Sequence, residues 1–294
     1  FPWLSSLPIC GGPAELVFSR FEGQNLASPS YIDSFRGQSG ESLCLLYRER
    51  SGEVLQFPGA GDFRISQSKI EGCFQNQEKA LAELRFLGPV LSYWFELRGC
   101  PTLHAAAVAR NGRAIAFVSR HGGGKSGLAA SMIQAGASLL TDDLLVLDER
   151  ENLWEARPSY PEMRMWPDEV SHFVGSPEDL PQVHPESGKR RVAVGDRGFG
   201  SFLDASTPLA RIYLASRSEE TAAGVEIQPV ARSEALIELV RHSFSARLVE
   251  GAGLQPARLD RLARLVRSVP VHRLVYPSGF ERLPEIAEIL MGSW

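Results

Sequence analysis

The sequence has few cysteines and no long apolar run, and each shortage excludes a class of protein. The four cysteines, Cys10, Cys44, Cys73 and Cys100, include no CxxC pair, so we predict neither a zinc site nor a redox dithiol. No apolar run approaches the roughly 18 residues of a membrane-spanning helix, and no signal-peptide pattern is visible at the start. We therefore expect reduced cysteines, no membrane partner and a cytoplasmic location.

An excess of basic charge is also absent. The 294 residues carry a net charge of −4, with acidic and basic side chains mixed along the chain. No basic field that would attract nucleic acid is expected, so we predict no nucleic-acid partner. The hydrophobic share of 44% is enough to bury a full core, and the length allows one large or two modest domains.

The first quarter of the chain is predicted to be β-rich. Short apolar or alternating runs at 14–18, 42–47 and 54–57 are typical of strands. The cluster Gly37-Gln38-Ser39-Gly40 is typical of a turn between them. We therefore interpret residues 1–76 as a small β-rich N-terminal module.

The rest of the chain, residues 77–294, is predicted to form a larger domain with both helices and strands. Apolar residues recur at spacings of three and four from 77 to 97, which predicts a helix that Gly88-Pro89 kinks or divides. After residue 150 the patterns predict a strand at 210–215 and helices at 233–249, 255–268 and 283–291.

The stretch from 102 to 149 has the clearest pattern. In order, it predicts a strand at 103–109, a hairpin turn at Asn111-Gly112, a strand at 114–118, a glycine-rich turn at 119–124, a helix at 125–135 ended by Gly136, and strands at 139–143 and 144–148. A glycine-rich turn between a strand and a helix is the context in which proteins bind phosphate groups.

The glycine-rich turn nearly matches the pattern G-x-x-x-x-G-K-[ST], with Ser119 in place of the first glycine. Glycines at 122–124 let backbone N–H groups turn towards phosphate oxygens without a side-chain clash, and the helix that follows directs its positive dipole end at the same anion. Lys125 would reach the β- and γ-phosphates of a nucleotide, and the Ser126 hydroxyl would bind Mg²⁺. The turn is therefore predicted to bind ATP.

Two adjacent carboxylates, Asp142 and Asp143, end the predicted strand 139–143. We expect this strand to pack beside strand 114–118, which leads into the glycine-rich turn, so that the carboxylates face the phosphates. One carboxylate would hold Mg²⁺, and the other would accept the proton of an attacking hydroxyl. Asp148-Glu149 resembles the acidic end of a Walker-B strand but lies too close to Lys125 in sequence, so we interpret it as a strand end and a polar turn.

His104 lies in an apolar strand, where a histidine is usually a core residue. The Asn111-Gly112 hairpin would return this strand antiparallel to the strand that leads into the glycine-rich turn, and thus bring His104 towards the site. Together, Leu103-His104 with the hairpin, the Gly-Gly-Gly-Lys-Ser loop and Thr141-Asp142-Asp143 resemble the HPr kinase/phosphorylase family. The closest resemblance is to its shorter bacterial relatives, the HPr-kinase-like serine kinases.

The resemblance covers roughly residues 80–290 and is most specific from 103 to 148. It implies an α/β fold with an HPr-kinase-like P-loop domain, a mixed sheet and flanking helices. It also implies a kinase that uses ATP and Mg²⁺ and phosphorylates a serine hydroxyl. Some of the relatives accompany lasso-peptide biosynthesis and act on the peptide's C-terminal serine, which makes that serine the expected acceptor. The family's downstream glycine-rich stretch has no convincing counterpart here, so the sequence leaves open whether the reverse, phosphorolytic reaction occurs and whether HPr is the substrate.

The resemblance also implies roles for individual residues. Asp142 would be the general base, His104 would lie near it, Arg164 would stabilise charge, and Lys125 would act on the phosphates. Mg²⁺ would be held by Ser126, Asp143 and Glu162. The residues expected to bind ATP are Ser119, Gly122, Gly123, Gly124, Lys125, Ser126, Lys189 and Arg190. From the residues alone, the basic loop Lys189-Arg190-Arg191 would clamp either the nucleotide phosphates or a carboxylate of the acceptor. Arg120 and His121 are weaker candidates for contact with the nucleotide.

Other functions remain open at the level of the sequence. The acceptor could be a small carrier protein such as HPr, or free serine, instead of a ribosomally made peptide. The chain could also be a non-catalytic nucleotide sensor or an assembly ATPase, although the latter would need a remote Walker-B strand and an arginine finger that we do not find. The sequence leaves the oligomeric state open, including a homo-oligomer.

Overall fold

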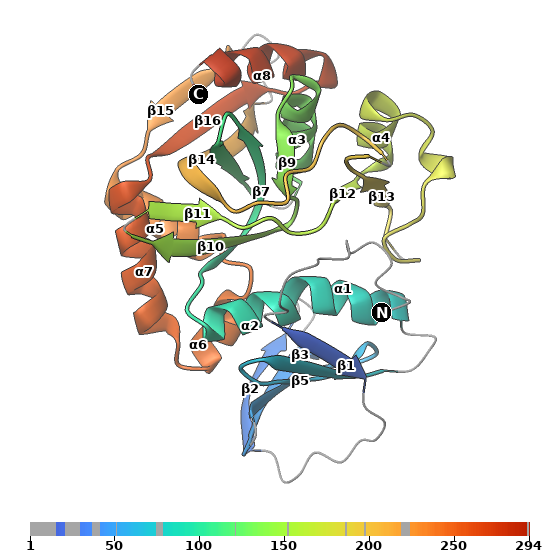
Figure 1. Cartoon of the computed structure of the whole chain (residues 1–294), viewed down its shortest axis with the longest axis vertical. Coiled ribbons are helices and arrows are strands. Elements are labelled where there is room, and N and C mark those ends of the chain that lie inside the picture. The colour runs from blue at the N-terminus through green and yellow to red at the C-terminus, as the bar shows by residue number, and fades with distance from the viewer. Residues whose placement is uncertain are drawn as a thin grey trace. The chain divides into compact units, whose positions relative to one another are not determined.

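The computed structural model describes residues 16–20, 30–36, 42–50, 52–74, 79–120, 122–151, 153–185, 187–196, 198–218, 224–292 and 294. Cys10, the predicted turn at 37–40 and His121 lie outside these ranges. The chain divides into two compact units, one formed by Phe1–Cys100 and Phe244–Arg258, the other by Pro101–Ser243 and Leu259–Trp294 (Figure 1). The sequence-based division after residue 76 stays a prediction. None of the helices in the described ranges combines the length and the apolar character needed to cross a membrane.

The first unit contains a six-stranded sheet in the order β1-β6-β5-β4-β3-β2. Its strands are β1 (Val17–Arg20), β2 (Ser30–Arg36), β3 (Ser42–Glu49), β4 (Gly52–Phe57), β5 (Gly61–Ile65) and β6 (Lys69–Cys73). Adjacent strands are antiparallel except for β1 and β6, which are parallel. The strands predicted at 42–47 and 54–57 are confirmed. In the run predicted at 14–18, β1 begins at Val17, and residues 14 and 15 lie outside the described ranges.

Helices α1 (Lys79–Arg85) and α2 (Leu91–Leu97) of this unit are joined by a π-helical turn, η2 (Phe86–Val90). The turn contains Pro89, which cannot donate a backbone hydrogen bond and so shifts the ladder locally. The predicted helix, and its interruption at Gly88-Pro89, are therefore confirmed. The same unit includes α6 (Ala246–Gly251) and the first turn of α7 (Gln255–Ser268), where Arg258 forms a buried ion pair with Glu96 of α2 at 2.9 Å.

The second unit is built on a mixed sheet of eight strands, and it therefore has the predicted α/β class. Seven strands follow the order β11-β10-β7-β8-β14-β16-β15, and β9 pairs with β7. The strands are β7 (Thr102–Arg110), β8 (Arg113–Val118), β9 (Ser138–Thr141), β10 (Leu144–Arg150), β11 (Leu153–Ala156), β14 (Thr207–Ser218), β15 (Glu226–Pro229) and β16 (Val271–Pro277). A separate pair joins β12 (Glu162–Met165) to β13 (Arg190–Ala193).

The predicted hairpin joins β7 to β8 in antiparallel register, with Ala107 opposite Ala116. Asn111 and Gly112 have φ angles of 50° and 72°, the left-handed values that a two-residue turn of this kind requires. On its other side β8 pairs with β14 in parallel, and β14 pairs with β16 in parallel. Three parallel strands therefore end at the edge of the sheet where β8 leads into the glycine-rich loop.

One expectation about the sheet was wrong. Strand β9, which leads into Asp142-Asp143, does not pack beside β8 but pairs antiparallel with β7, opposite Ala107 to Ala109. The tight hairpin places β7 on one edge of β8, and β14 occupies the other edge, so no position beside β8 remains for β9. The acidic corner instead lies against the middle of β7, where the Ala105 amide donates a hydrogen bond to the Asp143 carbonyl at 3.2 Å.

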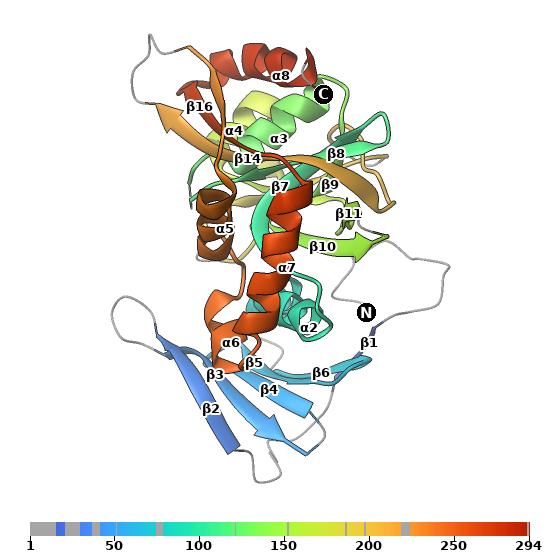
Figure 2. The same ribbon diagram turned by 90° about the vertical axis from the view of Figure 1, so that its left-hand side faces the viewer.

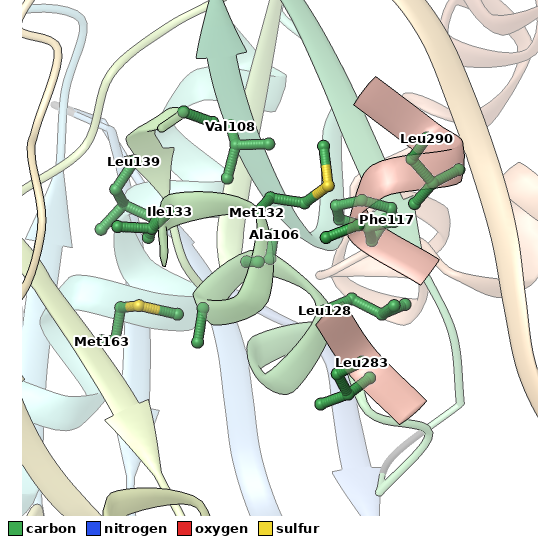
Figure 3. Packing of buried hydrophobic residues seen from close by; sticks show 14 of the residues in the cluster. Ala106, Val108, Phe117, Leu128, Met132, Ile133, Leu139, Met163, Leu283 and Leu290 are labelled. Atoms are coloured by element: carbon green, nitrogen blue, oxygen red, sulfur yellow. The ribbon is translucent and has the colours of Figure 1, made fainter. Parts of the chain in front are cut away.

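Helices cover both faces of the large sheet (Figure 2). On one face lie α3 (Lys125–Gln134), α4 (Pro167–Phe173) and α8 (Leu283–Gly292); on the other lie α5 (Arg232–Arg241) and the part of α7 within this unit. Figure 3 shows the core beneath α3, where Met132 lies beside Phe117 of β8 and Ile133 lies beside Leu139 of β9. Two short 3₁₀ turns, η3 (Pro177–Asp179) and η4 (Phe280–Arg282), complete the described elements.

The single helix predicted at 233–249 is instead two helices, so this expectation was also wrong. Helix α5 ends at Arg241 and α6 begins at Ala246. Between them, the His242 carbonyl accepts a hydrogen bond from the His104 amide at 2.9 Å, and Ser243 forms an isolated bridge with Leu103. Pairing with the start of β7 takes the chain out of its helix at this point. The helices predicted at 255–268 and 283–291 are confirmed.

Candidate active site

The loop between β8 and α3 holds its shape through glycines. Gly122 and Gly124 have φ angles of 75° and 86°, in the left-handed region that favours glycine. A Cβ atom added to Gly123 would lie 2.7 Å from the Cβ of Ser119, so a side chain there would collide with the loop itself. Gly124 precedes the first residue of α3, whose N-terminal amides therefore follow directly on the glycines.

Lys125 lies back across this loop. Its side-chain Nζ donates a hydrogen bond to the Ser119 carbonyl at 3.3 Å, and the residue is 8% exposed. Burial lowers the pKa of Lys125, while the charges of Asp142 and Asp143 oppose that shift. The Ser119 hydroxyl donates to the Arg120 carbonyl at 3.1 Å, so the residue that departs from the glycine pattern helps to close the loop.

Asp142 faces the first turn of α3. Its Oδ1 accepts a hydrogen bond from the Ser126 hydroxyl at 3.1 Å, and its Oδ2 accepts one from the Arg164 backbone amide at 2.9 Å. The residue is 4% exposed. Burial raises the pKa of Asp142, and the neighbouring charge of Asp143 adds to the rise.

Asp143 faces the other way, towards β7 and β12. His104 Nδ1 lies 2.9 Å from its Oδ1, and Arg164 Nη1 donates to its Oδ2 at 3.1 Å. Burial alone would raise the pKa of Asp143, but the hydrogen bond and charge of His104, with the charge of Arg164, bring it below its usual range. Its φ of 85° is unusual for a residue other than glycine, and such strain often occurs at functional sites.

These residues line one pocket at the end of the parallel strands. Of the residues predicted from the sequence, the pocket contains His104, Gly122, Gly123, Gly124, Lys125, Ser126, Asp142, Asp143, Arg164 and Lys189. They come from β7, the glycine-rich loop, α3, the acidic corner, β12 and the loop before β13. The antiparallel hairpin thus brings His104 to the site, as the sequence indicated, although its nearest carboxylate is Asp143 rather than Asp142.

Several predicted residues do not line this pocket. Glu162, predicted to hold Mg²⁺, instead forms an ion pair with Arg191 of the basic loop, with 3.5 Å between Glu162 Oε1 and Arg191 Nη1. Arg190 and Ser119 are also absent from the pocket wall. The Ser119 carbonyl accepts the hydrogen bond from Lys125 Nζ. Arg120 is exposed. Asp148 pairs with Arg157 at 2.6 Å and does not line the pocket, but it lies within β10, which continues to Arg150, so its interpretation as a strand end was wrong.

The pocket also contains residues that sequence reasoning missed: Trp166, Asp168, Glu169, Arg217 and Phe280. Pro167 followed by Asp168 and Glu169 is a sequence signal for the start of a helix. In the structure, the Glu169 carboxylate accepts a hydrogen bond from the Trp166 amide at 2.9 Å, as in a capping box. Arg217 lies two residues past the strand predicted at 210–215, and the rule that ligands gather beyond such strand ends could have found it. Phe280 carries no comparable signal in the sequence.

The oxygen atoms around Ser126 fit a magnesium ion. Mg²⁺ is commonly held by one or two carboxylates or hydroxyls together with the phosphates of a substrate, and not by an all-protein cage. Ser126 and Asp142 supply a hydroxyl and a carboxylate that already face one another. Within the described ranges, no group of three or more His, Cys, Asp or Glu side chains forms a metal cage. The residues therefore suit a metal ion that is shared with a bound polyphosphate.

A glycine-rich loop, a buried lysine and a hydroxyl–carboxylate pair at one strand edge give this pocket the chemistry to hold a polyphosphate with a divalent cation. No protein-family model matches the chain, and no curated protein matches it. Among solved structures it is similar to one described as the structure of the HPr(Ser) kinase/phosphatase from Coxiella burnetii. That match has 14% sequence identity and a TM-score of 0.36, and it covers 65% of this chain and 94% of that chain. A likeness of this extent assigns neither a family nor an activity.

Proposed function

We propose that this chain is an ATP-dependent kinase that transfers the γ-phosphate to a hydroxyl group. The observation that carries the proposal is the pocket that combines Lys125 and Ser126 with the two differently placed carboxylates Asp142 and Asp143. Phosphoryl transfer requires a cradle for the phosphates and a carboxylate near the attacking hydroxyl, and catalysis is then largely positioning and electrostatics. A loop that only bound phosphate would not need the second carboxylate or His104.

The cradle is formed by the loop amides and by cations. The amides around Gly122–Gly124 and the start of α3 donate to phosphate oxygens, and Lys125 supplies a positive charge behind them. Lys189, whose Nζ lies 5.6 Å from the ring centroid of Trp166, adds a second cation at the pocket wall. Ser126 and Asp142 would hold a magnesium ion, which would supply positive charge next to the phosphates.

The contacts favour a division of labour between the two aspartates that exchanges the roles implied by the family resemblance. Asp142 bonds to the Ser126 hydroxyl and therefore belongs to the metal side of the site. Asp143, with its side chain 24% exposed, is held by His104 and Arg164 and belongs to the acceptor side. Its lowered pKa keeps Asp143 ionised at neutral pH, so its oxygen can accept the proton of the attacking hydroxyl.

For the acceptor we propose a serine hydroxyl on a ribosomally made peptide, with the C-terminal serine of a lasso peptide as first choice. This choice rests on the sequence resemblance between residues 103–148 and the HPr-kinase-like serine kinases. A small carrier protein such as HPr and free serine are the alternatives. The pocket itself requires only a hydroxyl that can approach Asp143.

The test is incubation of the full chain with ATP, Mg²⁺ and each class of acceptor, followed by mass spectrometry. The peptides to include are those encoded beside the gene, each with a matched variant whose C-terminal serine is replaced by alanine. A mass gain of one or more phosphates on the serine peptide and none on the alanine peptide is the expected result. Asp143→Asn serves as the inactive enzyme control.

Two other outcomes would replace the kinase proposal. Tight ATP binding without transfer to any acceptor would indicate a non-catalytic nucleotide sensor. ATP hydrolysis at the same rate with and without an acceptor would indicate an ATPase. Binding of ATP that does not depend on Lys125 would remove the pocket described here as the nucleotide site.

A further inference from the structure

Arg217, which no sequence motif identified, lies beside the glycine-rich loop. It is the next-to-last residue of β14, and its register partner on the parallel strand β16 is Tyr276. On the other side of β14, Leu214 is opposite Val118, the last residue of β8. Arg217 therefore extends past the point at which β8 turns into the loop, at the edge where parallel strands gather their ligands.

The guanidinium of Arg217 packs directly on the loop. A Cβ atom added to Gly124 would lie 2.7 Å from Arg217 Nε and 2.8 Å from Nη2. The same arginine lines the pocket together with Lys125 and Ser126. Within the described part of the chain no ion pair joins Arg217 to a carboxylate, so its charge is not neutralised there.

Tyr276 holds this arginine in place. Tyr276 is 1% exposed, and its hydroxyl donates a hydrogen bond to the Gly123 carbonyl at 3.2 Å. The Arg217 guanidinium hydrogen-bonds to the same hydroxyl. A hydroxyl can accept from one group and donate to another, so Tyr276 links the loop backbone to the guanidinium and fixes the orientation of both.

We propose that Arg217 contacts the phosphates held by the glycine-rich loop, and that Tyr276 positions it for this contact. The inference rests on the proposed function, because it names a further residue of the same site. Arginine is suited to this contact, since its planar guanidinium can donate two hydrogen bonds to one phosphate group. As charge develops on the transferred phosphoryl group and on the leaving oxygen, such a donor stabilises the transition state.

The test measures binding before turnover. ATP, ADP, AMP and inorganic tripolyphosphate are titrated, each with Mg²⁺, into the wild-type chain and into Arg217→Gln, Arg217→Lys and Tyr276→Phe. Arg273→Gln is the matched control, because Arg273 lies on the neighbouring strand β16, pairs with Glu234 and is absent from the pocket. Thermal unfolding of every variant is followed in parallel.

We expect Arg217→Gln to weaken ATP and tripolyphosphate by about tenfold or more, the loss typical of a hydrogen bond to a charged group. AMP should be affected least. Arg217→Lys should recover part of the affinity, Tyr276→Phe should lose less than Arg217→Gln, and Arg273→Gln should bind as the wild type does. In the kinase assay, Arg217→Gln should also lower kcat at saturating ATP.

Unchanged binding of tripolyphosphate by Arg217→Gln would overturn the inference. So would a loss of affinity matched by an equal loss of thermal stability, with Arg217→Lys no better than Arg217→Gln, because that pattern describes a structural support of the loop. The kinase proposal fails separately: a wild-type chain that binds tripolyphosphate through Arg217 but transfers no phosphate would refute the kinase and retain this contact.

Discussion

At the scale of single residues, Lys125 is a buried charge that contacts the loop backbone, through the Ser119 carbonyl at 3.3 Å. Lys125→Met keeps most of the side-chain volume but removes the ammonium. We expect ATP affinity to fall by about 100-fold, because a charge-assisted contact to phosphate is lost. Thermal stability should stay the same or rise, since burial lowers the pKa of Lys125 and the folded state therefore holds the charged form at a cost. Isothermal titration and a melting curve measure the two effects.

The two adjacent aspartates provide a second prediction, in which isosteric changes have opposite effects on stability. The pKa of Asp142 is raised, so its ionisation destabilises the folded chain; this penalty grows from the usual pKa of about 3.9 up to the raised pKa and is constant above it. The pKa of Asp143 is lowered, so its contribution is present above that pH and is lost only on acidification. At pH 7, Asp142→Asn should therefore raise the melting temperature and Asp143→Asn should lower it.

The variants Asp142→Asn and Asp143→Asn also distinguish the proposed metal-binding role of Asp142 from the proposed general-base role of Asp143. Asp142→Asn should raise the Mg²⁺ concentration needed for nucleotide binding, measured by titration without any acceptor. Asp143→Asn should leave that requirement unchanged and lower kcat by about 10²- to 10⁴-fold, the usual contribution of a general base. If Asp142→Asn instead abolished transfer with an unchanged Mg²⁺ requirement, Asp142 would be the base, as the family resemblance implies.

At the scale of elements, two glycines of the loop have similar left-handed backbone conformations and different surroundings. Gly122 and Gly124 both have positive φ angles, but an added Cβ meets nothing within 4 Å at Gly122, whereas at Gly124 it meets first the Tyr276 hydroxyl and then Arg217 Nε, the latter at 2.7 Å. Gly122→Ala should cost only the strain of a left-handed residue, about 1–2 kcal/mol. Gly124→Ala should in addition displace Arg217 and weaken ATP binding by about another tenfold. Equal effects of the two changes on affinity would contradict the described packing.

The elements that the sequence predicted well are those set by local chemistry. Asn111-Gly112 defines its own turn, and the glycines at 122–124 followed by Lys125 define a loop and a helix start. The partner of β9 depended on which edges of β7 and β8 were already occupied, which is a property of the whole sheet. The break after Arg241 likewise depended on pairing with Leu103 and His104, far away in sequence.

In the site too, only residues that are close together in the sequence could be predicted to meet. Lys125, Ser126, Asp142 and Asp143 come from one short stretch, so their spacing could indicate that they meet. Glu169 and Arg217 come from later segments whose approach to the loop depends on α4 packing near α3 and on β14 pairing with β8. Glu162 was predicted at the site but pairs with Arg191, because β12 and β13 place the two side chains on adjacent strands.

At the scale of the whole molecule, the two compact units differ in what should stabilise them. The candidate site lies entirely within the unit formed by 101–243 and 259–294. The buried pair Arg258–Glu96, with side chains 2% and 3% exposed, lies entirely within the other unit. Each feature therefore gives a way to change the stability of one unit by itself.

Calorimetric unfolding of the full chain should accordingly show two separable transitions. ATP with Mg²⁺ at 100 times its dissociation constant should stabilise the unit with the pocket by about 2.7 kcal/mol and raise only that transition. Arg258→Met leaves the Glu96 carboxylate without its buried partner and should lower the other transition by about 3–5 kcal/mol. Arg273→Gln, which removes a partly exposed pair, is the control and should change either transition by less than about 1 kcal/mol. A single transition displaced by both ATP and Arg258→Met would contradict this expectation and would mean that the two units unfold together. Helix α7, which contributes residues to both units, would then be the element that couples their unfolding.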